Sequence, residues 1–535
     1  MDLLPVPRTF DDDTLATGLD PNLVLPAMIR RRALEDPDRT FMIEVGGRSV
    51  TYGEFWDELL GWCTLLQSLG AKPGDRVASL LPASIDSQLL WLAASCIGAW
   101  EVAVNPDLPG ELLHHVFTDS APVHCFARND TAHVAQNCGV SVALTVVPRG
   151  ESFVVGVERA TLETLPTPSD VSCVIYTSGT TGPAKGAIIP WGQLSTILGR
   201  TPRSWFSESD AVYAPLPMFH VTGRSPTITM ADVGGRVVFR EKLSISEFWE
   251  DVRAYQCTST TAAGASLLLA MPSTDDDADN PLTIALFGPL GPAAIEFGRR
   301  FGVSLISNYG STEIGFPFTN RDVALETCHI AGWLRPGYQA RVVNSEGVDL
   351  PFGAAGELLI KPPNPSLMTQ GYLNRPDATA KAIVDGWYHT GDAAILHESL
   401  PGRPALQFVD RIKDTVRRFG ENISGSALET IINADAELIE CAVLGVPSEV
   451  AGQEIFLVVR PIDAGLFVPE SLFERLRSQL PKHCLPAFIG VRADEFPKTP
   501  NGKIRKVELI GEIDRVASGE VWVSPAVVGS RVQKA

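Results

Sequence analysis

The sequence predicts an α/β protein with a large N-terminal domain of helix-covered parallel sheets, a small β-barrel within that domain, and a smaller α+β domain at the C-terminus. Three observations support this prediction. The 535 residues exceed what one hydrophobic core usually supports, so two or more domains are expected. Strand-like and helix-like segments alternate through most of the chain, as they do in parallel sheets covered by helices. The pattern changes near residue 331 and again after residue 414.

The first elements illustrate the alternation. Residues 48–70 begin with a short strand, after which Thr51 is expected to cap a helix. Glu54, three residues later, completes a capping box, and Gly70 is expected to end the helix. Residues 76–82, RVASLLP, follow as a buried strand.

No membrane span or secretory signal is predicted. The most apolar stretch, at 88–104, is shorter than the roughly 20 residues that a span needs and contains Glu101. We therefore expect a buried helix that runs into a strand. The N-terminus, MDLLPVPRTFDDD, has no basic region followed by an apolar core, so it does not resemble a signal peptide.

Charge and cysteine content restrict the partners and the compartment. The formal net charge of −19 argues against nucleic acid or an anionic membrane surface as a partner, because both attract clustered Lys and Arg. The nine cysteines form no C-x-x-C pair, which argues against a zinc site or a disulfide framework. A reduced, cytoplasmic location is the simpler interpretation.

The second half of the chain predicts the barrel and the C-terminal domain. Short alternating strands with turn residues follow residue 331, as in a small barrel over about 331–410. The sequence DRIKD, 410–414, is charged and flanked by predicted strands, so we expect the domain boundary there. The expected division is residues 1–410 as one domain and 415–535 as the other.

A glycine-rich string at 176–186, YTSGTTGPAKG, predicts a phosphate site. It follows a predicted buried strand at 171–175, and consecutive N–H groups in such a turn form a concavity that binds anions. It is not a Walker A loop, because Ala184 precedes Lys185 and Gly186 follows it. A surface turn that happens to be rich in Gly, Ser and Thr is the alternative when the string is taken alone.

The string resembles the phosphate-loop motif of the adenylate-forming superfamily, which comprises acyl-CoA synthetases, peptide-synthetase adenylation domains and beetle luciferases. Further matches follow in the family's order: LPMFHVTG (216–223), NYGSTEIG (308–315), GWYHTGD (386–392), FVDRIKDTVRRFGENISGSALE (408–429) and KTPNGKIRK (498–506). At 285–294, Gly288 and Leu290 fit the family's turn against adenine, whereas Pro289 and Gly291 depart from it. The tract RRFGENIS is similar to that of acyl-CoA and carnitine-CoA ligases.

The resemblance implies a role for each matching residue. It places His220 against the acyl group, Tyr309 on adenine, Thr312 on the α-phosphate, and Asp392 with Arg411 at the ribose. It assigns adenylation to Lys503, which bridges the carboxylate and the phosphate, and Mg²⁺ to Thr180 and Glu313. The phosphate cradle comprises Thr177, Ser178, Gly179, Thr180, Thr181 and Gly182, with Lys185 as its anchor, and the nucleotide is further bordered by Gly288, Gly310 and Ser311.

The resemblance also implies mobility and a two-step reaction. The C-terminal domain is expected to be mobile about a hinge at 411–414, centred on Lys413, which swings a loop with Arg417, Arg418 and Gly420 into the site. ATP, Mg²⁺ and coenzyme A are the expected cofactors. The implied function is activation of a small-molecule carboxylic acid to acyl-AMP, followed by thioester formation with coenzyme A. Two alternative functions are left open: loading of an acyl carrier protein, and nucleotide binding without catalysis. A homodimer is also left open.

Overall fold

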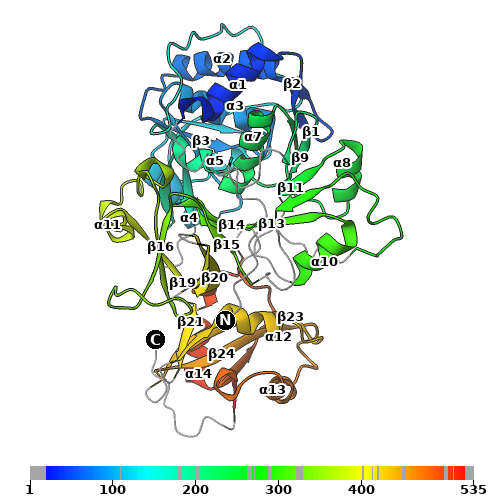
Figure 1. Ribbon diagram of the computed structural model, residues 1–535, viewed down its shortest axis with the longest axis vertical. Coiled ribbons are helices and arrows are strands. Elements are labelled where there is room, and N and C mark those ends of the chain that lie inside the picture. Colours follow the sequence, from blue (N-terminus) through cyan, green and yellow to red (C-terminus); the bar gives the residue numbers. More distant parts are fainter. Residues whose placement is uncertain are drawn as a thin grey trace.

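The computed structural model describes residues 20–108, 110–177, 184–198, 205–261, 268–269, 271–286, 292–320, 329–400, 403–411, 414–418, 421–448, 452–498, 504–509 and 511–524. They form three β-sheets with helices between and around them (Figure 1). The predicted α/β class is confirmed.

The first sheet has six strands in the order β6-β5-β3-β4-β7-β8. All of its pairings are parallel except the last, where β8 returns antiparallel to β7. This β7–β8 hairpin flanks the glycine-rich string. The strands are β3 (Arg76–Leu80), β4 (Trp100–Ala103), β5 (His124–Ala127), β6 (Ala143–Val146), β7 (Val171–Thr177) and β8 (Lys185–Pro190).

The second sheet is 14-stranded and changes character at β13. From β1 through β10, β9, β11 and β12 to β13 the pairings are parallel, with β2 added antiparallel at the edge. Beyond β13 every pairing is antiparallel. The first group is β1 (Thr40–Glu44), β2 (Ser49–Thr51), β9 (Ala211–Ala214), β10 (Arg236–Phe239), β11 (Ser259–Thr261), β12 (Ile284–Leu286) and β13 (Ser304–Ser311).

The antiparallel group differs from the predicted barrel. Its strands are β14 (Gly315–Asn320), β15 (Gly332–Leu334), β16 (Gln339–Val343), β17 (Ala355–Lys361), β18 (Ile383–Val384), β19 (Trp387–Leu400) and β20 (Arg403–Arg411). Among the described residues they form an open run, in which β16 is the edge and β15 pairs with β14. Because that pairing continues the larger sheet, the strands extend it instead of closing on themselves.

Helices fill the space between the first two sheets. Helix α3 contacts β4 and β7 of the first sheet and β1 of the second, and α7 packs on β9 and β10. The predicted capping box is present: Glu54 N donates to Thr51 Oγ1 (3.2 Å) and Thr51 N donates to Glu54 Oε2 (2.8 Å). The helices are α1 (Leu25–Glu35), α2 (Tyr52–Ser68), α3 (Ile85–Cys96), α4 (Gly110–Ser120), α5 (Ala132–Gln136), α6 (Trp191–Ser195), α7 (Val221–Val233), α8 (Phe248–Ala254), α10 (Pro292–Phe301) and α11 (Pro376–Ala382), with 3₁₀ turns η2 (Pro21–Leu23) and η5 (Pro365–Leu367).

The apolar stretch at 88–104 becomes the buried part of α3 followed by β4, as predicted. Within the part of the chain that the structure describes, no helix combines the length and apolar character needed to cross a membrane.

The third sheet has six strands and belongs to the C-terminal segment, drawn in yellow to red in Figure 1. It has its own apolar core, which includes Val416, Leu428, Leu457 and Leu472. The elements are β21 (Thr415–Arg418), β22 (Glu421–Ser424), α12 (Gly425–Ile432), β23 (Leu438–Ser448), β24 (Gly452–Pro461), α13 (Pro469–Arg477), η6 (Lys482–Cys484), β25 (Phe488–Val491), η7 (Lys506–Leu509), α14 (Gly511–Ser518) and β26 (Trp522–Val523). The α+β character predicted for this segment is present.

A buried ion pair joins the first sheet to α7. Arg224 Nη2 lies 2.6 Å from Glu101 Oε2, and both side chains are completely buried. The guanidinium also lies 4.5 Å from the centre of the Trp91 ring. Each charge therefore depends on the other, because neither reaches water.

We expect Arg224→Met to destabilise the protein strongly, by about 3–5 kcal/mol, because it leaves Glu101 charged and buried without its partner. The double variant Glu101→Leu/Arg224→Met should recover much of that loss. Thermal and urea unfolding measure both. Arg299→Met, which breaks an exposed ion pair with Glu296, is the control and should change stability little. A single variant at Arg224 that unfolds like the wild type would contradict this account.

Candidate active site

Predicted residues from four separate motifs meet beside the junction of β13 and β14. Tyr309 and Glu313 come from this junction, Asp392 from β19 and Arg411 from the end of β20. Lys185, at the start of β8, lies over the ring of Tyr372, whose hydroxyl is bonded to Glu313. The structure thus brings together side chains that are far apart in the sequence.

The first group of side chains is centred on Asp392. Tyr309 donates its hydroxyl hydrogen to Asp392 Oδ2 at 2.6 Å, and Arg411 Nε lies 2.8 Å from Asp392 Oδ1. Strand pairing brings Arg411 next to Asp392, because the two residues are partners in the β19–β20 register. Burial and the adjacent carboxylate raise the pKa of Tyr309, so its phenol stays protonated and donates.

A tight reversal of the chain carries Tyr309 and Glu313. A Cβ on Gly310 would lie 1.9 Å from the carbonyl oxygen of Gly315, so no larger residue fits at 310. Glu313 N donates to Ser311 Oγ at 3.2 Å, and Gln193 Nε2 donates to the Thr312 carbonyl at 2.6 Å. The buried Gln193 is a supporting residue that the sequence motifs do not indicate.

The second group is centred on Glu313, which is buried. Tyr372 donates its hydroxyl hydrogen to Glu313 Oε1 at 3.0 Å, and the hydroxyl of Tyr388 lies 3.4 Å from that of Tyr372. The Lys185 ammonium lies 4.4 Å from the centre of the Tyr372 ring. Sequence reasoning missed Tyr372, which lies in none of the motifs above.

Magnesium shared with a nucleotide fits this chemistry. The described residues contain no group of three or more His, Cys, Asp or Glu side chains that could hold a metal. A single carboxylate suffices for Mg²⁺, which keeps waters and takes further ligands from substrate phosphates. Glu313 can supply that carboxylate. Thr180, the other predicted metal ligand, lies outside the described residues.

The glycine-rich string begins and ends at paired positions. Thr177 and Lys185 are register partners of β7 and β8, and Thr177 Oγ1 donates to the Lys185 carbonyl at 3.3 Å. The hairpin therefore holds both ends of the string beside the Glu313 group. Ser178, Gly179, Thr180, Thr181 and Gly182 lie outside the described residues, as do Gly288, Leu290, Lys413, Gly420 and Lys503.

His220 lies immediately before α7, in a half-buried position. Its N–H donates to the Pro217 carbonyl at 3.2 Å, and its ring centre lies 4.8 Å from that of Phe219. The contacts described above for Asp392 and Glu313 do not include His220, and its expected place against the acyl group stays a prediction.

The basic residues after the predicted hinge have different positions from those expected. Arg417 and Arg418 lie in strand β21, not in a loop. The Arg418 side chain pairs with Glu454 at 2.7 Å and donates to the carbonyls of His483 and Leu485. Arg418 therefore stabilises its own domain, because Glu454 and two carbonyls bind its guanidinium. Its expected part in a loop that swings into the site stays a prediction.

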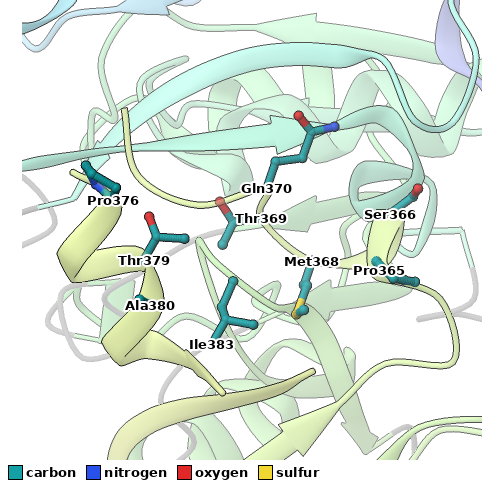
Figure 2. Close-up of a pocket in the computed structure, with 9 residues that line it drawn as sticks. All are labelled: Pro365, Ser366, Met368, Thr369, Gln370, Pro376, Thr379, Ala380 and Ile383. Carbon is teal, nitrogen blue, oxygen red and sulfur yellow. The ribbon is translucent and has the colours of Figure 1, made fainter. Parts of the chain in front are cut away.

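A depression of about 630 Å³ has the lining residues that Figure 2 labels. One of them, Thr369, donates its backbone N–H to the Glu313 carbonyl at 2.6 Å. The depression is lined by Pro365, Ser366, Met368, Thr369, Gln370, Pro376, Thr379, Ala380 and Ile383. The side chains of Thr369, Gln370 and Thr379 donate to backbone carbonyls of this protein. Since none of the predicted site residues lines it, we do not assign the nucleotide or the acid to this depression.

Comparisons with known proteins agree with the motifs. The family model described as AMP-binding enzyme matches residues 29–373, and that described as AMP-binding enzyme C-terminal domain matches residues 427–503. The chain is 28% identical to the fatty acid–[acyl-carrier-protein] ligase ScoC of Streptomyces coeruleorubidus, over 86% of this chain and 91% of that protein. It is 27% identical to the 2-succinylbenzoate–CoA ligase of Bacillus mycoides (91% and 98%) and 28% identical to the crotonobetaine/carnitine–CoA ligase of Salmonella paratyphi B (86% and 93%).

Solved structures share the fold. ATP-bound MatB from Rhodopseudomonas palustris superposes with a TM-score of 0.81 at 24% identity, covering 92% of this chain and 99% of that one. The o-succinylbenzoate coenzyme A synthetase MenE from Bacillus subtilis, in complex with ATP and magnesium ion, gives 0.78 at 22% identity, with 90% and 98% covered.

We expect Asp392→Asn to weaken ATP binding about tenfold or more, because it removes a charged acceptor and the ion pair with Arg411. Titration of the purified protein with ATP measures this. Asp251→Asn is a matched control: Asp251 is also buried, accepts from the Tyr213 hydroxyl at 2.7 Å and pairs with Arg240, outside this cluster. Equal loss of ATP affinity in both variants would mean that Asp392 acts only on stability.

Proposed function

The chain belongs to the AMP-binding enzyme family, within the adenylate-forming superfamily, and on that premise we propose that it is an acyl-CoA ligase. It activates a carboxylic acid with ATP to an acyl-adenylate and then transfers the acyl group to the thiol of coenzyme A. The observation that carries the proposal is the Tyr309–Asp392–Arg411 group beside the buried Glu313, because it offers a diol acceptor next to a metal-binding carboxylate.

In the first half-reaction the acid's carboxylate attacks the α-phosphorus of ATP and pyrophosphate leaves. Asp392 accepts hydrogen bonds from the ribose hydroxyls, which fixes the nucleotide. Glu313 and Thr180 would hold Mg²⁺, which would neutralise phosphate charge when bound. The 177–182 backbone cradles the pyrophosphate portion, and Lys503 supplies a positive charge where negative charge develops.

In the second half-reaction the thiol attacks the acyl carbonyl of the adenylate and AMP leaves. Lys503 and a path for the thiol both need the same face of the site, so we propose that the 415–535 domain rotates about residues 411–414. In the arrangement described here, Asp410 contacts the C-terminal side of the proposed hinge. Its carboxylate accepts from Ser424 Oγ and from Ser426 N, each at 3.1 Å, on the far side of the proposed hinge, while the adjacent Arg411 binds Asp392.

Coenzyme A is the favoured acceptor, because the relatives named above include two CoA ligases. The relative ScoC is named as an acyl-carrier-protein ligase, so a carrier protein is the second candidate for the acyl acceptor. A cytoplasmic enzyme with reduced thiols is consistent with the described cysteines, none of which forms a disulfide. The homodimer that the sequence leaves open remains a prediction.

ATP–pyrophosphate exchange with a panel of carboxylic acids tests the function. We expect exchange that depends on one class of acid, followed by release of AMP when coenzyme A is added. Acyl transfer to a holo carrier protein but not to coenzyme A would favour the second candidate. ATP binding without exchange for any acid would support a non-catalytic nucleotide binder and overturn the proposal.

We expect Lys503→Ala to abolish ATP–pyrophosphate exchange but to retain thioester formation from preformed acyl-AMP, because the lysine acts only in the first half-reaction. Both rates are measured on the same preparation. Lys482→Ala, which changes an exposed lysine of the same domain, should affect neither rate. Normal exchange in the Lys503 variant would remove this residue from the mechanism.

We expect Lys413→Pro to slow thioester formation more than adenylation, because proline fixes φ at the residue about which the domain turns. Single-turnover assays of the two half-reactions give the ratio. A variant that loses both half-reactions to the same extent would count against a hinge at this position.

A further inference from the structure

Tyr372 lies between two residues that the proposed mechanism uses. Its hydroxyl donates to Glu313 Oε1, and the face of its ring is 4.4 Å from the Lys185 ammonium. Tyr372 and Glu313 are both buried, at 7% and 8% exposure. No sequence motif above includes Tyr372, yet it contacts both the metal-binding carboxylate and the anchor of the phosphate string.

Backbone bonds fix the position of this ring. Tyr372 pairs with Ala187 of β8, and the Ile188 N–H donates to the Gly371 carbonyl at 2.9 Å. On the other side, Tyr372 N donates to Thr379 Oγ1 at 2.9 Å; Thr379 is labelled in Figure 2. The preceding segment is tied to the site as well, since Thr369 N donates to the Glu313 carbonyl at 2.6 Å.

The hydroxyl of Tyr372 acts as a hydrogen-bond donor toward Glu313. A carboxylate oxygen only accepts hydrogen bonds, so in this 3.0 Å contact the phenol hydroxyl is the donor. The Tyr388 hydroxyl, 3.4 Å away, can donate to the Tyr372 oxygen and complete a chain that ends at Oε1. Of the described residues, Tyr372 alone bonds to the Glu313 carboxylate, so this bond sets its orientation and leaves Oε2 for a metal ion.

We propose that Tyr372 is a positioning residue that orients Glu313 for Mg²⁺ and holds Lys185 through its ring, which couples the metal site to the phosphate string. This inference rests on the proposed function. Groups that hydrogen-bond to a metal ligand typically contribute 10–100-fold to metal affinity or activity. An ammonium over a buried ring is attracted to its π face.

Tyr372→Phe separates the two contacts, because phenylalanine keeps the ring and loses the hydroxyl. We expect the Mg²⁺ concentration at half-maximal ATP-induced thermal stabilisation to rise about tenfold. ATP affinity at saturating Mg²⁺ should stay close to the wild type. Tyr372→Leu also removes the ring, so it should weaken ATP binding even at saturating Mg²⁺.

Tyr213→Phe is the matched control, since Tyr213 makes the same phenol–carboxylate bond to Asp251 outside the site. It should lower the melting temperature without moving the Mg²⁺ midpoint. An unchanged midpoint in Tyr372→Phe would overturn the inference and leave the proposed function intact. A wild-type protein that ATP and Mg²⁺ do not stabilise would overturn both.

A double-mutant cycle provides a second measurement. Once Glu313→Gln has removed the metal-binding carboxylate, Tyr372→Phe should change the Mg²⁺ midpoint no further. Additive effects of the two changes would show that Tyr372 does not act through Glu313, and would overturn the inference.

Discussion

The second sheet reverses its strand direction at β13, and the candidate site depends on that reversal. Strand β13 pairs parallel with β12 on one side and antiparallel with β14 on the other. The chain turns back so tightly that the carbonyl of Gly315 leaves no room for a side chain at Gly310. Tyr309 lies just before this turn and Glu313 within it, so one constraint on the backbone places both beside β19 and β20. The antiparallel strands then deliver Asp392 and Arg411 as register partners.

The types of side chain in the candidate site do not by themselves distinguish it from a structural cluster elsewhere in the fold. Tyr213, Asp251 and Arg240 repeat the arrangement of Tyr309, Asp392 and Arg411, with a phenol and a guanidinium on one buried carboxylate. What differs is the position. The first arrangement joins α8 to its own sheet, whereas the second lies where β13, β19, β20 and the β7–β8 hairpin meet. A buried carboxylate that is already hydrogen-bonded becomes a binding group only where a ligand can reach it.

The sequence predicts the local elements and the motif positions well, because both depend on residues near one another. The Thr51–Glu54 capping box, the strand before the glycine-rich string and the helix at the start of 88–104 are all present. The sequence patterns do not predict contacts between residues that are far apart in the chain. Tyr372 is 59 residues from Glu313 along the chain. Arg418 donates to the carbonyls of residues 483 and 485, which are also distant in sequence. The alternating pattern of a strand does not reveal whether a group of strands closes into a barrel. The predicted roles of Lys503 and of the 178–182 string remain predictions.

A crystal structure of the protein with ATP and Mg²⁺ tests the central claim most directly. The account predicts ribose hydroxyls within hydrogen-bond distance of Asp392, a magnesium ion coordinated by Glu313, and the Tyr372 hydroxyl still bonded to the other oxygen of that carboxylate. A nucleotide bound elsewhere, with Asp392 contacting only Tyr309 and Arg411, would contradict it.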